Sequence, residues 1–102
     1  MGLFTSIFSK KGLEDLKKDF PLIQGEVGAI VVDAIQKCGV KNNNLGATMP
    51  EMYKEAAAQL KSKLGYKLTA QEMSEFLNSR QFTKGGEGNE KAAKLADIML
   101  SN

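Results

Sequence analysis

The sequence predicts an all-α protein, a small bundle of four main helices preceded by an amphipathic N-terminal segment. Three observations support this fold class. Apolar residues recur at helical spacing in several segments, two of these segments open with a Thr-x-x-Glu capping pattern, and no segment alternates polar and apolar residues with a period of two. With 102 residues, the chain is long enough for one domain with its own core.

The first expected element is the amphipathic segment 1–12. Four large apolar residues of this segment fall on one helical face: Leu3, Phe4, Ile7 and Phe8. The apolar residues that follow Gly12 fall on the opposite side of the same helical wheel, so one straight helix would carry two unrelated apolar faces. We therefore expect a break near Gly12, with a single helical domain over 13–102.

The apolar face of the N-terminal segment needs a surface to bind, because each large apolar side chain gains about 1.5–3 kcal/mol on full burial. The chain's own core is the first expectation, and a protein partner or a second copy of the chain is the next. A membrane interface comes third, because only Lys10 and Lys11 would attract anionic lipid. Gly2 and Ser6 also fit the short myristoylation pattern, which we rank below the unmodified alternatives.

The second expected element is a central helix over 22–38. Its apolar residues follow a helical period, and Glu26, Asp33 and Lys37 gather on the opposite side as a solvated stripe. Pro21 is expected at or just before the start, and Gly39 marks the end. A buried strand is the alternative for the β-branched run, but the period of the charged positions favours a helix.

Three further helices are expected after the asparagine-rich loop. Thr48 and Glu51 form a capping pattern for a helix that ends at Gly65, and Thr69 and Glu72 form a second one for a shorter helix. A last helix is expected from about Asn89 to the end of the chain. The predicted core is shared by these helices and the central one: Ile30, Val31, Ala34, Tyr53, Leu60, Phe76 and Leu95.

The composition excludes several classes of chemistry. The chain has no histidine and one cysteine, Cys38, so it has no Ser-His or Cys-His pair, no internal disulfide and no cysteine zinc site. The glycine-rich loop at 83–88 lacks the spacing of a phosphate-binding loop. We therefore predict a protein that is not an enzyme and needs no cofactor or metal. Since no apolar run of about 18 residues occurs, we expect a cytoplasmic location.

Two regions are candidates for binding nucleic acid or an acidic partner. Between residues 35 and 67 lysines outnumber acidic residues by six to two, and four of them form a candidate basic surface: Lys54, Lys61, Lys63 and Lys67. Residues 68–80 resemble the first helix of many helix-turn-helix regulators, with Asn78 at the turn. The glycines that follow interrupt the place of the recognition helix, and only Lys91 and Lys94 of the next helix would face phosphate.

The leading functional hypothesis is a small intracellular helical interaction protein, regulatory or inhibitory, that acts through helix-face contacts with another protein or with itself. The alternative is a helix-turn-helix-like DNA-binding regulator that uses the region from Lys67 onward. A second alternative is a peripheral membrane module anchored by residues 2–11.

Overall fold

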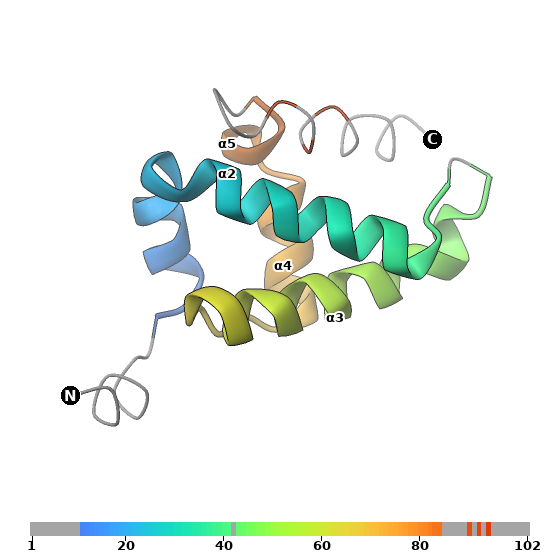
Figure 1. Ribbon diagram of the computed structural model, residues 1–102, viewed down its shortest axis with the longest axis horizontal. Coiled ribbons are helices and arrows are strands. Elements are labelled where there is room, and N and C mark those ends of the chain that lie inside the picture. The colour runs from blue at the N-terminus through green and yellow to red at the C-terminus, as the bar shows by residue number, and fades with distance from the viewer. Residues whose placement is uncertain (1–10, 42, 85–89, 91, 93, 95–102) are drawn as a thin grey trace.

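The computed structural model describes residues 11–41, 43–84, 90, 92 and 94, and these residues are mostly helical. The helices follow one another as α2 (Leu13–Cys38), α3 (Leu45–Leu64), α4 (Ala70–Leu77) and α5 (Arg80–Thr83) (Figure 1). The described ranges contain no strand, as the all-α prediction requires. Three of the four predicted main helices are seen, as α2, α3 and α4, and most of the fourth, expected from about Asn89, lies outside the described residues. The short helix α5 was not predicted.

Helix α2 begins earlier than predicted. It starts at Leu13, and the Asp15 carboxylate accepts a hydrogen bond of 3.0 Å from the backbone N–H of Gly12, which satisfies one of the amides that a first turn leaves free. Pro21 therefore lies inside the helix and not at its start. The backbone departs from helical geometry at Ile23 (φ −128°, ψ 25°), and Figure 1 shows the first part of α2 turned sharply against the rest.

The bend at Pro21 is completed by a contact from far along the chain. Proline has no N–H, so the carbonyl of Lys17, four residues earlier, loses its helical partner. The side chain of Gln81 in α5 donates a hydrogen bond of 2.7 Å to this carbonyl oxygen. A residue 64 positions away thus supplies the bond that Pro21 cannot make.

Helix α3 also begins before its predicted capping pattern, which is therefore wrong as a start signal. Asn44 precedes the helix, and its side chain accepts from the N–H of Lys41 at 2.8 Å and donates to the carbonyl of Gly39 at 3.0 Å. This fixes the loop so that the helix starts at Leu45. Thr48 then lies inside α3, where its hydroxyl donates to the carbonyl oxygen of Asn44 at 2.9 Å.

The second predicted capping pattern is confirmed at the start of α4. The N–H of Glu72 donates to the hydroxyl of Thr69 at 3.0 Å, and the N–H of Thr69 donates to the Glu72 carboxylate at 2.9 Å. Both orphan amides of the first turn gain a partner, which is the source of the stability of this motif.

The two threonines give a paired prediction. Thr69→Ala is expected to lower the free energy of unfolding by about 1 kcal/mol, because it removes the cap of α4. Thr48→Ala is expected to cost less, since alanine favours a helix interior and the backbone N–H of this position still bonds to Asn44. Urea denaturation of both variants measures the difference. If Thr48→Ala lowers the free energy of unfolding more than Thr69→Ala does, Thr48 acts as a cap, and this result would contradict the start of α3 at Leu45.

The core lies between α2, α3 and α4. Five of the seven residues predicted for it are at most 3% exposed: Ile30, Val31, Ala34, Leu60 and Phe76. Tyr53 is half-buried at the margin of the core, and Leu95 lies outside the described residues. At one end of the core, Phe20 of α2 meets Phe76 of α4 edge to face at 5.1 Å between ring centroids, and Phe82 of α5 lies 5.7 Å from Phe76.

Candidate interaction surfaces

The N-terminal amphipathic segment, 1–12, is described only at Lys11 and Gly12, where it joins the helical domain. Leu3, Phe4, Ile7 and Phe8 lie outside the described residues. At the junction, the backbone N–H of Lys67 donates to the carbonyl oxygen of Lys11 at 2.7 Å, and the Lys11 ammonium lies 5.4 Å from the centroid of the Tyr66 ring. The chain is thus fixed at Lys11 to the loop between α3 and α4.

Tyr66 holds this junction against α2. Its ring is buried, and its hydroxyl donates a hydrogen bond of 2.7 Å to the carboxylate of Asp19. Burial, followed by the hydrogen bond and the negative charge of Asp19, raises the pKa of Tyr66 to about 12. Tyr66 therefore stays neutral and connects α2, the α3–α4 loop and the N-terminal junction.

The raised pKa of Tyr66 predicts a loss of stability at alkaline pH. Its stabilising contribution is fully present below the ordinary pKa of 10 and is lost as the pH rises through about 12, because the unfolded chain releases the proton first. We expect Tyr66→Phe to cost about 1–3 kcal/mol at neutral pH through the lost bond to Asp19. Urea denaturation of the native protein and of Tyr66→Phe at several pH values up to 12 measures the free energy of unfolding of each. The difference between these two free energies should shrink as the pH rises.

The two proteins share every other titratable group, so only the Tyr66 hydroxyl differs between them. A difference in the free energy of unfolding that stays constant with pH would contradict the raised pKa of Tyr66.

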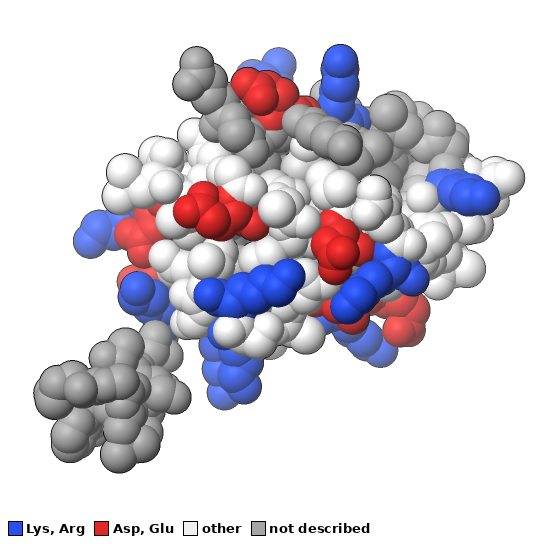
Figure 2. All heavy atoms as spheres, viewed as in Figure 1, with Lys and Arg blue, Asp and Glu red and all other residues white. Residues whose placement is uncertain are grey.

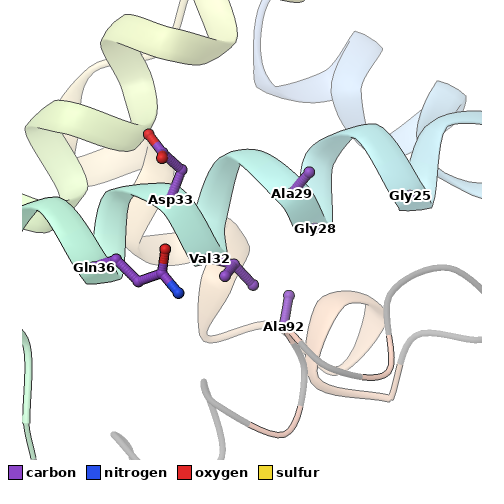
Figure 3. Close-up of a pocket in the computed structure, with 7 residues that line it drawn as sticks. All are labelled: Gly25, Gly28, Ala29, Val32, Asp33, Gln36 and Ala92. Carbon is purple, nitrogen blue, oxygen red and sulfur yellow. The ribbon is translucent and has the colours of Figure 1, made fainter.

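A second surface is an open groove of about 430 Å³ along α2 (Figure 3). We call it the α2 groove, and its lining comes from α2 and from Ala92: Gly25, Gly28, Ala29, Val32, Asp33, Gln36 and Ala92. Figure 3 shows the side chains of Val32 and Ala92 turned toward each other, whereas Asp33 points toward α3. The groove has a floor of small side chains, which lets another backbone come close.

A polar network joins α2 to α3 beside the groove. The amide nitrogen of Gln59, a buried residue, donates to Asp33 at 2.7 Å and to Glu55 at 2.8 Å, and Lys63 donates to the Gln59 amide oxygen at 3.2 Å. The hydrogen bond from Gln59, together with the charge of Lys37 at 3.5 Å, lowers the pKa of Glu55. The sequence predicts that Glu26, Asp33 and Lys37 form a solvated stripe. Asp33 is instead half-buried and bonded to Gln59, whereas Glu26 and Lys37 are exposed.

The predicted basic surface is distributed over α3 and the loop after it. All four of its lysines are exposed: Lys54, Lys61, Lys63 and Lys67. The Lys54 ammonium lies 3.8 Å from a carboxylate oxygen of Glu51, and the Lys63 ammonium donates a hydrogen bond to the amide oxygen of Gln59. Figure 2 shows lysine and arginine side chains interspersed with carboxylates on the face drawn there. On that face, positive charge is mixed with negative charge.

The region resembling a helix-turn-helix has an unexpected second helix. Only Asn78 and Ser79 separate α4 from α5, but α5 is a single turn and its Phe82 is buried. A recognition helix needs several exposed side chains in register with base edges, which one turn does not supply. Lys94 is exposed, and Lys91 lies outside the described residues.

Cys38 is half-buried at the end of α2. Burial, followed by the charges of Glu55 and Glu51, raises the pKa of its thiol, so the reactive thiolate is disfavoured. Within the described ranges, no three or more His, Cys, Asp or Glu residues come together in a way that would hold a metal ion. Among the helices of that same part of the chain, none has the length and apolar character needed to cross a bilayer.

Comparison with known proteins adds no functional information: no protein-family model, no curated protein and no solved structure matches this chain.

Sequence reasoning missed the residues that organise these surfaces. Gln59 and Tyr66 gain their importance from partners 26 and 47 positions away, Asp33 and Asp19. Helical periodicity describes one segment at a time and carries no signal for such pairs. The large ring of Tyr66 in a short loop between two helices was the one visible clue, because such a ring usually finds a buried site.

Proposed function

We propose that this protein is a small helical interaction protein, regulatory or inhibitory, that contacts another protein through its N-terminal amphipathic segment, residues 2–11. The observation that supports the proposal is the junction at Lys11. The hydrogen bond from Lys67 and the contact with Tyr66 fix Lys11, the residue directly after the segment, to the loop between α3 and α4. A contact element joined to the domain at a fixed residue loses less entropy on binding than one joined by a free linker.

The packing of α2 supports a contact outside the domain. Leu16 and Phe20, which form the apolar face of the first part of α2, are already buried in the core, and Leu13 is half-buried against it. Gly12 separates this face from the apolar face of the preceding segment. The face of α2 nearest to the segment is thus already packed in the core, which supports a partner surface for the four apolar side chains, at about 1.5–3 kcal/mol for each one fully buried.

Removal of residues 2–10 tests the proposal by stability. If the segment binds another protein, this deletion is expected to change the free energy of unfolding of the remaining domain by less than about 0.5 kcal/mol. Docking on the chain's own core, the first expectation from the sequence, predicts a loss of several kcal/mol instead. Urea denaturation at low protein concentration separates the two, and a large loss would contradict the proposal.

A matched pair of variants tests the contact itself. Ile7→Asp with Phe8→Asp changes the apolar face, whereas Thr5→Asp with Ser9→Asp adds the same charge on the polar face. We expect the first pair alone to abolish binding to a co-purified partner, or to shift a self-associated species to monomer in sedimentation. Equal binding by both pairs would contradict the proposal.

The same proteins distinguish the alternatives. Association that disappears after nuclease treatment and weakens steeply with salt would favour the DNA-binding regulator. Flotation with anionic liposomes that is lost on deletion of residues 2–10 would favour the membrane module. Either result would replace a protein partner as the target of this chain.

A further inference from the structure

Helix α2 consists of two helical parts that meet at Ile23, where the backbone leaves helical geometry (φ −128°, ψ 25°). Residues 11–22, which we call the arm, precede this break and are turned sharply against the rest of α2 (Figure 1). A hinge is a position of this kind, because a change in the dihedral angles of one or a few residues moves a whole element. The bend at Ile23 is therefore a point at which the arm can swing away from the domain.

The arm is held by residues that come after α3 in the chain. Its Leu16 and Phe20 side chains are buried in the core, and its described hydrogen bonds and ring contacts involve five later residues: Tyr66, Lys67, Phe76, Gln81 and Phe82. These five residues are connected to the arm along the chain only through the second part of α2 and through α3. The same residues of a second copy can thus receive the arm with the same contacts.

Two features beside the break disfavour the closed arrangement. Leu22 is 84% exposed, and it is the one large apolar residue that the described part of the chain leaves open to water. The amide oxygen of Gln24 is buried and has no hydrogen-bond partner among the described residues. Exposed apolar surface and an unsatisfied buried acceptor both raise the free energy of the folded state.

We infer that two copies of this chain exchange their arms, each arm opening at Ile23 and packing on the α3–α4 loop, α4 and α5 of the other copy. The contacts of the arm are kept, because the residues on both sides are the same as in the single chain. The two opened hinges pass each other at the two-fold axis, where Leu22 of one copy packs on Leu22 of the other and the Gln24 amide gains access to water. The contact at Leu22 is the one that a single chain cannot make, and it favours the dimer.

Cross-linking between two differently labelled full-length chains tests the exchange. Both chains carry Cys38→Ser, which removes the native thiol, and both carry Ile7→Asp with Phe8→Asp, which removes the apolar face of the N-terminal segment. One chain adds Gly12→Cys and the other adds Lys67→Cys, because a Cβ at Gly12 would lie 3.9 Å from the carbonyl oxygen of Lys67.

The control pair replaces Lys67→Cys by Gln36→Cys, since Gln36 is exposed near the other end of α2, away from Gly12 (Figure 1). Each pair is unfolded together in urea, refolded at high protein concentration and treated with a short bismaleimide. After exchange, position 12 of one copy lies beside position 67 of the other. We expect the first pair to give at least about tenfold more covalent heterodimer than the control pair, because the exchange raises the effective concentration of the two thiols.

A second measurement tests the contact at the hinge. In the same background, Leu22→Asp is expected to raise the dissociation constant of the dimer in sedimentation equilibrium at least about tenfold, because it places two carboxylates at the two-fold axis. Ala58→Asp, on the exposed side of α3, should leave this constant unchanged. Circular dichroism checks that each variant stays helical.

Heterodimer yields that do not differ between the two pairs would overturn the inference, whether the chains are monomeric or associate without exchange. Equal dissociation constants for Leu22→Asp and Ala58→Asp would also overturn it. All of these chains lack the apolar face of residues 2–11, so failure here is distinct from failure of the proposed function.

Discussion

Ile30→Asp is expected to lower the free energy of unfolding by about 4 kcal/mol or more, the largest effect of any single substitution considered for this protein. Ile30 lies in the central part of α2 and is buried in the core. The substitution removes apolar contacts and places a carboxylate in an apolar core, so the folded state either buries a charge or opens. Since a domain of this size has a total stability of about 5–15 kcal/mol, much of it would be lost.

Ala58→Asp is the matched control, because Ala58 is exposed on α3 and the change also introduces an aspartate into a helix. We expect it to cost less than about 1 kcal/mol, mainly through helix propensity. Thermal and urea denaturation of both variants measure the two effects. Similar melting temperatures for Ile30→Asp and the native protein would contradict the placement of α2 at the centre of the core.

Phe82→Ala is expected to cost about 3–5 kcal/mol, although α5 is only four residues long. Phe82 is fully buried, and its ring lies 6.0 Å from that of Phe20 and 5.7 Å from that of Phe76. Removal of the Phe82 ring leaves a cavity and abolishes its contacts with Phe20 and Phe76. Each aromatic contact is worth about 0.5–1.5 kcal/mol beyond burial. The substitution also loosens α5, which carries Gln81.

Lys84→Ala is the control for this second prediction, since Lys84 is exposed directly after α5 and its loss should cost less than about 0.5 kcal/mol. Urea denaturation again gives the comparison. If Phe82→Ala destabilises no more than Lys84→Ala does, then α5 is not packed on the core as the structure shows it.

Both predictions involve the core, but the sequence reveals the two residues unequally. Ile30 is one of a series of apolar residues at helical spacing, so its burial follows from the periodicity of α2 alone. Phe82 stands next to a glycine-rich stretch in a segment too short to show a period. Its burial depends on Phe20 and Phe76, which belong to other helices.

The candidate surfaces divide in the same way. The amphipathic character of residues 2–11 and the lysines of α3 are properties of the sequence. The structure adds the junction that fixes Lys11, the network around Gln59 and the groove into which Ala92 is packed. Each of these additions joins residues from different elements, and for that reason no local pattern indicated it.

The sequence by itself determined the helical class, the cap of α4 at Thr69 and most of the core, because helical periodicity and capping act over a few neighbouring residues. Tertiary structure decided what packs against the bend in α2. Pro21 alone predicts a break in the helix, and the backbone does leave helical geometry at Ile23. The sequence does not indicate that Gln81, 64 positions from Lys17, donates to the carbonyl that Pro21 leaves without a partner, because this bond exists only in the folded arrangement of α2 and α5.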